Sequence, residues 1–285
     1  MMLRRLLCLA LALLGFCPAG HAAPQAMVAA AHPLAVEAGL DVLRRGGSAV
    51  DAAIAVQMVL GVVEPQASGI GGGGFLLHYD AATQAIAVYD GRETAPAGAT
   101  PAMFLDRDGK RLGFFEAVAS GISVGVPGAL AMLELAQKEH GKLDWRELFA
   151  PAIVVAREGF AVPPRLAGWL QRMPMLRSEP AILATYYNAD GTPKKVGDKV
   201  TNAALAETMQ QIADQGIQAF YQGAVAAEMV ERVRSHVRPG TLALSDLSDY
   251  RAVKREALCG PYRVDRKSTR LNSSHSAKSR MPSSA

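Results

Sequence analysis

The stretch EPQASGIGGGGFLLHYDAATQAIAVYDGRETAP, residues 64–96, combines a glycine-rich segment, two apolar runs and the charged pair Arg92-Glu93. Its glycines at 69 and 71–74 predict a tight turn, because a residue without Cβ reaches backbone conformations and close approaches that other residues cannot. The runs Phe75–Tyr79 and Ala85–Asp90 then predict the two strands of a hairpin. Arg92 follows the second strand, where its planar fork of donors is well placed to bind a carboxylate.

Helices are predicted on both sides of this stretch. Pro33 suits a first helical turn that Gly46 and Gly47 end, and Ser48 with Asp51 forms a capping-box pattern before a second, apolar helix. Further helices are predicted over 127–141, 145–158 with a restart or kink at Pro151, 163–173, 179–186, 202–216 and 223–237, with Asp144 as a cap. The pattern alone indicates a helix-rich α/β chain with early paired strands.

The two ends differ in composition from the middle. Residues 1–23 have a positive start, an apolar run and a small-residue exit, which predicts a secretory signal peptide and a periplasmic or secreted protein without a stable membrane anchor. Residues 266–285 hold seven serines and no acidic residue, so we expect a disordered tail from a sequencing or vector artefact; the alternative is a natural basic tail. Residues 24–265 are expected to form one partial domain.

Charge and cysteine content change once these ends are set aside. Seven of the 30 basic residues lie in them, which leaves 23 basic against 26 acidic residues, so the high overall pI is no argument for a nucleic-acid partner. Only Cys259 remains, which excludes an internal disulfide and favours a buried structural thiol over a nucleophile.

No common catalytic pattern stands out in the residues. The glycine-rich turn lacks the Gly-Lys-Ser/Thr of a phosphate-binding loop, and its glycines favour close backbone packing over nucleotide binding. Serines 68 and 120 are not in a nucleophile elbow. Histidines 32, 78, 140 and 236 stand singly, so structural roles are expected and no metal or cofactor is predicted.

Several segments in fixed order resemble the γ-glutamyltransferase (glutathione hydrolase) family, in the N-terminal part of its large subunit. They are MVAAAHPLAVEAGLDVLRRGGSAVDAAIA (27–55), EPQASGIGGGGF (64–75), DGRETAP (90–96), SGISVGVPGAL (120–130), LFAPAIVVAREGFAV (148–162) and LSDLSDYRAV (244–253). The resemblance implies an α/β fold of the N-terminal-nucleophile hydrolase type, an αββα sandwich of two stacked sheets between helical layers, incomplete in this chain.

The resemblance also implies a mechanism. Such enzymes are precursors that cut themselves, and the new N-terminal threonine of the small subunit attacks γ-glutamyl amides such as glutathione, with its own α-amino group as base. The γ-glutamyl group then passes to water, an amino acid or a peptide. No position here matches the threonine motif, so the nucleophile is expected beyond the end of this chain, which by itself is expected to be inactive. The implied partners are γ-glutamyl compounds and the chain's own small subunit.

One substrate contact carries over from the resemblance. Within DGRETAP, Arg92 matches the family's arginine that binds the α-carboxylate of the γ-glutamyl group, and Glu93 is expected to orient it. The alternative for Arg92 is a structural ion pair with Glu93. Two other functions stay open: a cephalosporin-type acylase of the same architecture, which the Arg92 motif disfavours, and a truncated, non-catalytic binding protein.

Overall fold

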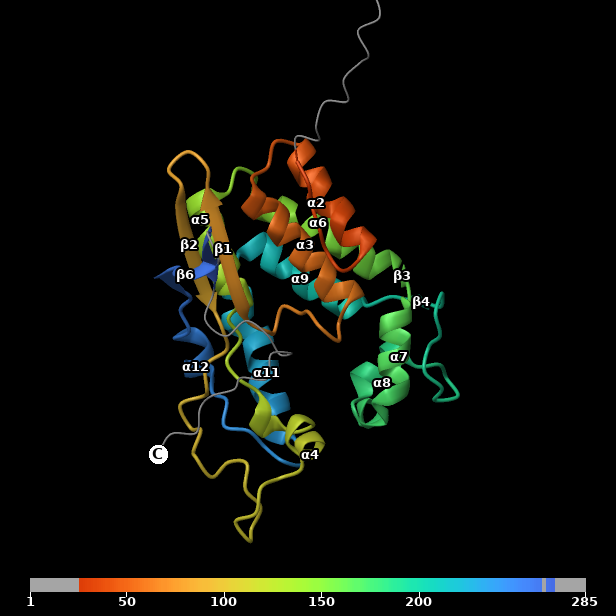
Figure 1. The fold of residues 1–285 in the computed structure, drawn as a ribbon. Helices are drawn as coiled ribbons and strands as arrows, with labels where there is room; N and C mark the ends of the chain where they lie inside the picture. Colours follow the sequence, from red (N-terminus) through yellow and green to blue (C-terminus); the bar gives the residue numbers. More distant parts are fainter. Residues whose placement is uncertain (1–25, 263–264, 270–285) are drawn as a thin grey trace, which may run out of the picture.

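The computed structural model describes residues 26–262 and 265–269 of the 285-residue chain, and in this part a three-stranded sheet stands beside a layer of packed helices (Figure 1). The predicted signal peptide, residues 1–23, lies outside the described residues. No helix in the described ranges is both long enough and apolar enough to cross a membrane.

The first two helices form as the sequence predicts. α2 spans Pro33–Arg44, with proline at its start, and α3 spans Ala49–Val63. At the start of α3 the Ser48 hydroxyl accepts from the Asp51 amide (3.1 Å), while the Asp51 carboxylate accepts from the Ser48 amide (2.8 Å). This reciprocal pair satisfies two donors that helix geometry leaves without partners, so the predicted capping box is confirmed.

Asp51 also ties α3 to a distant loop. Its side chain is fully buried, and the oxygen that accepts from Ser48 accepts from the amides of Lys142 (2.8 Å) and Leu143 (3.3 Å) as well. These two residues lie between α5, Ala129–His140, and α6, Trp145–Glu158. One carboxylate therefore links the start of α3 to the loop that joins α5 and α6.

The apolar core lies between the helices and extends to the sheet. α3 packs against α2, α5 and α6, and α6 packs against α9, Ala203–Gln215. α6 runs without interruption through Pro151, and Leu148 and Phe149 on it are fully buried. Because α3 is apolar nearly all round, it can only be stable in such an interior position.

The sheet has the strand order β1-β2-β5, with both pairs antiparallel. β1 (Gly74–Asp80) and β2 (Ala85–Gly91) form the predicted hairpin, and β5 (Val253–Glu256) adds to its edge. α5 packs on the hairpin, where Tyr89 is fully buried. Leu77 and Tyr79 of β1 instead have 42% and 58% of their surface exposed. The hairpin therefore has one covered and one more open face.

The remaining elements connect and cover these layers. In chain order they are α4 (Phe114–Val118), the 3₁₀ turn η1 (Gly121–Ser123), β3 (Phe160–Ala161), α7 (Pro164–Arg172), η2 (Pro174–Ser178), α8 (Pro180–Tyr186), β4 (Lys199–Val200), α10 (Gln218–Tyr221), α11 (Gly223–Ser235), α12 (Leu244–Ser248), β6 (Leu258–Tyr262) and β7 (Asp265–Thr269). The predicted later helices are thus present, with ends that differ from the prediction by at most two residues.

Three details differ from the sequence-based expectations. Asp144 occupies the N-cap position of α6, yet its side chain makes no capping hydrogen bond. Cys259 is exposed, so the expectation of a buried thiol is wrong. Its strand β6 pairs with β7 in a separate two-stranded sheet. Residues 266–269, expected to be disordered with the tail, form most of β7, because a backbone ladder needs no apolar side chains.

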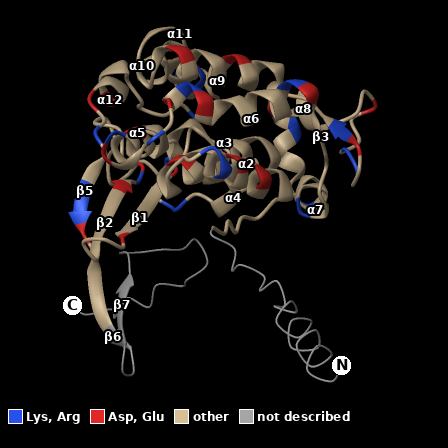
Figure 2. Ribbon diagram, turned by 90° about the horizontal axis from the view of Figure 1, so that it is seen from above, with Lys and Arg blue, Asp and Glu red and all other residues tan. Residues whose placement is uncertain are grey.

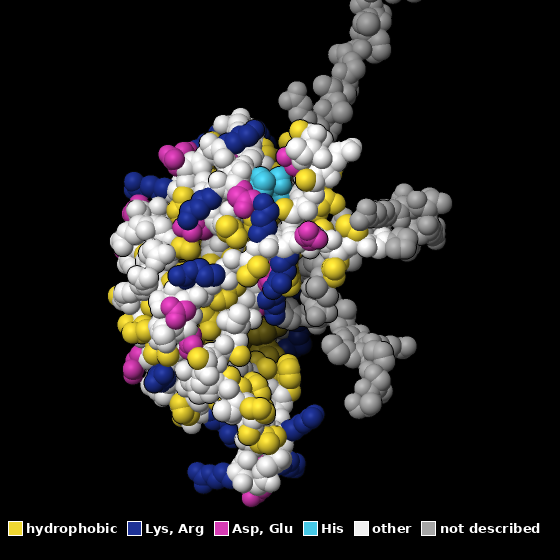
Figure 3. Space-filling view, turned by 90° about the vertical axis from the view of Figure 1, so that its left-hand side faces the viewer, with side chains coloured by type: hydrophobic (Ala, Val, Ile, Leu, Met, Phe, Trp, Pro, Cys, Tyr) yellow, Lys and Arg dark blue, Asp and Glu magenta, His cyan; other side chains and the backbone are white. Residues whose placement is uncertain are grey.

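Charge and apolar surface are distributed unevenly. Figure 2 shows β5 at the edge of the sheet with its basic residues in blue. Apolar side chains gather in the lower part of the face in Figure 3, where Figure 1 places the segment between β2 and α5. In this segment Phe114 and Phe115 are 74% and 56% exposed.

Candidate substrate-binding site

The glycine-rich loop packs directly against the arginine turn. The Gly72 carbonyl accepts from the amides of Gly128 and Ala129, both at 3.0 Å, which fixes the loop on the start of α5. A Cβ on Gly73 would lie 2.5 Å from the Gly91 carbonyl oxygen and 2.7 Å from the Glu93 carboxylate. The glycine at 73 is therefore required for close approach, as the sequence predicted for this run.

Arg92 lies immediately after β2. Its Nη1 is 2.8 Å from Oε2 of Glu93, and the two side chains are 40% and 30% exposed. The ion pair with Glu93, which from the sequence was the alternative role of Arg92, is therefore present, and solvent still reaches the guanidinium. A half-exposed arginine held by one neighbouring carboxylate can take a second, incoming carboxylate, because a guanidinium offers five donors.

The backbone of Arg92 is held by side chains. Oδ1 of Asp90 accepts from the Arg92 amide (3.0 Å), and the Tyr250 hydroxyl donates to the Arg92 carbonyl (2.7 Å). The other oxygen of Asp90 accepts from Nε of Arg255 on β5 (2.7 Å). Thr94, two residues on, bridges to Val126 just before α5. None of these partners was assigned a role from the sequence. Tyr250, Arg255 and Val126 come near the arginine turn only through the fold.

A second polar group lies on the covered face of the sheet. The rings of His78 and His140 stack with centroids 3.8 Å apart, so these histidines are not isolated as the sequence suggested. The Tyr89 hydroxyl donates to Glu139 (2.6 Å), which also pairs with Lys254 (2.5 Å). Burial, followed by the neighbouring His140, lowers the pKa of His78. The described residues contain no group of three or more side chains suited to hold a metal ion.

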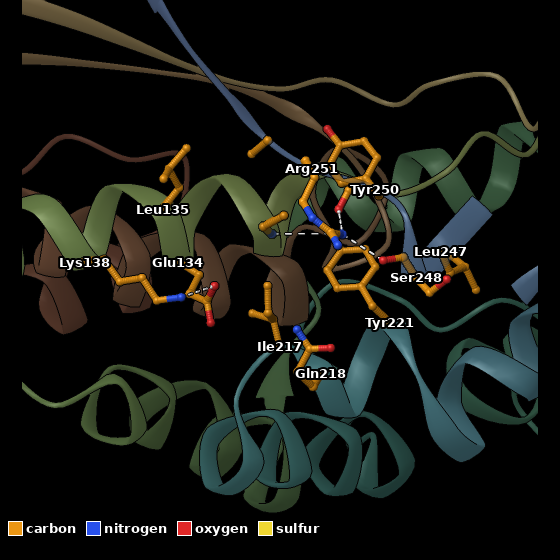
Figure 4. Close-up of a pocket in the computed structure, with 12 residues that line it drawn as sticks. Glu134, Leu135, Lys138, Ile217, Gln218, Tyr221, Leu247, Ser248, Tyr250 and Arg251 are labelled. Carbon is orange, nitrogen blue, oxygen red and sulfur yellow. Dashed lines mark hydrogen bonds and ion pairs between the residues drawn. The ribbon is translucent and has the colours of Figure 1, made fainter. Parts of the chain in front are cut away.

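A cavity of about 310 Å³ lies next to the arginine turn but does not include Arg92 (Figure 4). Tyr221 and Tyr250 line it, with parallel rings whose centroids are 6.1 Å apart. Its charged rim includes the Glu134–Lys138 ion pair (2.7 Å) and Arg251. Tyr250 therefore has its ring in the cavity wall while its hydroxyl bonds to the arginine turn.

Comparison with known proteins decides the family. The model of the family described as gamma-glutamyltranspeptidase matches residues 35–279. The chain belongs to this family. Among curated γ-glutamyltranspeptidase relatives, the glutathione hydrolase proenzyme of Bacillus subtilis (strain 168) is 42% identical over 236 residues, which cover 83% of this chain and 40% of that protein. The corresponding proenzyme of Escherichia coli (strain K12) is 36% identical, over 85% of this chain and 41% of the relative.

Solved structures agree with the family. The gamma-glutamyltranspeptidase of Helicobacter pylori superposes with a TM-score of 0.82 at 32% identity, covering 87% of this chain and 70% of that one. A cephalosporin acylase from Bacillus halodurans reaches 0.70 at 27% identity, over 86% and 48% of the two chains. The expected α/β fold of the N-terminal-nucleophile hydrolase type is confirmed. This γ-glutamyltranspeptidase-family chain spans about two fifths of the length of the curated relatives named above.

Proposed function

We propose that this chain is part of a secreted γ-glutamyltransferase that cleaves γ-glutamyl amides such as glutathione. The γ-glutamyl group would pass to a threonine outside the 285 residues and then to water, an amino acid or a peptide. The proposal includes export by residues 1–23, self-cleavage, and pairing with a small subunit. Support comes from the family membership and from the naming of the two curated relatives as glutathione hydrolase proenzymes.

The observation that carries the proposal is the setting of Arg92. Its guanidinium is partly exposed beside Glu93, while its backbone is held on both sides by Asp90 and Tyr250. We assign Arg92 to the α-carboxylate of the γ-glutamyl group. A charge-assisted hydrogen bond of this kind contributes roughly 1.5–3 kcal/mol. The ion pair with Glu93 would keep the guanidinium oriented for substrate binding before the substrate arrives.

Arg92→Lys in the complete gene product tests this assignment. Lysine keeps the charge but loses the planar fork, so we expect KM for a γ-glutamyl anilide to rise about tenfold or more, equivalent to about 1.4 kcal/mol. Arg157→Lys, at an exposed position in the last turn of α6, is the matched control and should leave KM unchanged. An unchanged KM in Arg92→Lys would remove Arg92 from the site. Reading the gene across codons 260–290 comes first, since it shows whether the frame truly encodes Arg266 to Ala285 and stops, or runs on past Asp265 into further family sequence.

A second candidate is an acylase that acts on cephalosporin-type side chains. The structural likeness to the Bacillus halodurans cephalosporin acylase favours it. Parallel hydrolysis of a γ-glutamyl anilide and a cephalosporin-type amide separates the two. Preference for the γ-glutamyl substrate supports the transferase, and preference for the other supports the acylase. Absence of both activities from the complete gene product would support a non-catalytic binding protein.

A further inference from the structure

The arginine turn is held by a segment far away in the sequence. Arg92 follows the end of β2, so the β-ladder no longer fixes its backbone. Its carbonyl accepts from Tyr250, 158 positions later, at 2.7 Å. Three residues after Tyr250 the same segment becomes β5, which pairs with β2 and brings Arg255 within 2.7 Å of Asp90. We refer to Tyr250 and Arg255 together as the clamp.

The ring of Tyr250 is held in place by its own packing contacts, independently of its hydrogen bond to Arg92. Only 9% of its surface is exposed, and its ring stacks on Tyr221 with an angle of 2° between the planes (Figure 4). A Cβ on Gly128 would collide with its hydroxyl, so the hydroxyl packs directly against the backbone of Gly128. An ordered donor of this kind restricts the peptide plane that it binds.

The Tyr250 hydroxyl also keeps its proton. Burial, followed by the nearby carboxylates of Asp90 and Glu93, raises the pKa of Tyr250 to about 12. The neutral hydroxyl therefore donates throughout the range in which enzymes are ordinarily assayed. Asp90, with its side chain 16% exposed, accepts on the opposite side of the same residue. Amide and carbonyl of Arg92 are thus both bound by side chains.

We propose that Tyr250 is a positioning residue for Arg92, acting through the backbone carbonyl to set the direction in which the guanidinium meets a substrate carboxylate. Arg255 assists by holding Asp90. This inference rests on the proposed function, in which Arg92 binds the α-carboxylate. A bidentate contact needs both carboxylate oxygens in line with the guanidinium, so a small rotation of the turn weakens binding without altering the acyl-transfer step.

The test compares two tyrosines with similar hydrogen bonds. Tyr250→Phe removes the hydroxyl and keeps the ring. Tyr221→Phe is the control, because its hydroxyl donates to a different backbone carbonyl, that of Pro127 at 3.0 Å, and accepts from the Ala131 amide at 3.4 Å, while phenylalanine keeps the ring that stacks on Tyr250. In the complete gene product we expect Tyr250→Phe to raise KM for a γ-glutamyl anilide about three- to tenfold with kcat within about twofold, corresponding to the loss of one hydrogen bond. Tyr221→Phe should change neither constant by more than about twofold.

Other outcomes separate this inference from the proposed function. Equal KM values in the two tyrosine variants, or a fall in kcat alone, would overturn the positioning role. If Arg92→Lys raises KM while Tyr250→Phe does not, the proposed function stands and this inference fails. If Arg92→Lys leaves KM unchanged, the assignment of Arg92 to the α-carboxylate fails, and this inference fails with it. Should Tyr250→Phe not fold, Arg255→Gln, at a side chain 54% exposed, is expected to raise KM about two- to threefold, and an unchanged KM would count against the clamp.

Discussion

Replacing Asp51 with alanine is expected to lower the free energy of unfolding by about 3 kcal/mol. One oxygen of this buried carboxylate accepts from the amides of Ser48, Lys142 and Leu143. Losing the acceptor of the Ser48 amide, which is one half of the capping box, costs about 1 kcal/mol. Each of the two loop amides adds about 1 kcal/mol, the low end for an unsatisfied donor, because Lys142 is exposed and water can reach this loop.

Urea denaturation of the 285-residue chain, followed by far-ultraviolet circular dichroism at low protein concentration, measures this change. Asp144→Ala is the control, since Asp144 is an exposed aspartate at the N-cap of α6 whose side chain makes no capping hydrogen bond, and its loss should lower the free energy of unfolding by no more than about 0.5 kcal/mol. Asp51→Asn, which keeps an acceptor but loses the charge, should cost about 1–2 kcal/mol. Equal denaturation midpoints for Asp51→Ala and Asp144→Ala, with unchanged slopes, would refute the reasoning.

Two further predictions concern the loop and the histidine pair. Gly73→Ala should lower the free energy of unfolding by about 1–3 kcal/mol, because its Cβ would meet the Gly91 carbonyl and the Glu93 carboxylate. Gly74→Ala, with open space around it, should be tolerated. Similar denaturation midpoints for the two variants would count against the packing argument. The pKa of His78 is lowered from 6.5 in the folded chain, so the folded state binds fewer protons than the unfolded state and stability should fall as pH drops below about 6.5. His78→Asn should reduce this fall between about pH 7 and about pH 5 in the same assay, and parallel curves for the two proteins would contradict it.

The elements that the sequence predicted well carry their signals locally. The signals of Pro33, of the Ser48–Asp51 pair and of the two apolar runs of the hairpin each depend on neighbours within a few residues. The elements α2, α3, β1 and β2 follow them. β5 was not predicted. Its sequence, VKRE, is exposed at all four positions and has no apolar face, so only its pairing with β2 makes it a strand.

The residues of the candidate site also divide into those with local sequence signals and those without. Arg92 and Glu93 were found because they lie side by side in a motif, and their ion pair is present. Tyr250 and the His78–His140 stack were missed, because a hydroxyl or an imidazole shows no partner in the sequence when that partner is many residues away. The exposed Cys259 was misjudged for a related reason, since general residue preference says little about a strand outside the core.

The hydrogen bond between Tyr250 and the Arg92 carbonyl also bears on the order in which the chain is made. Ribosomes synthesise the N-terminal part first, so the residues of the hairpin and Arg92 are made well before residue 250. Contacts between neighbouring segments such as α2 and α3 need only short loops to close, whereas this one must wait for 158 further positions. A growing chain therefore carries its arginine turn without the tyrosine donor until late in translation, and any product that stops before residue 250 lacks that donor permanently.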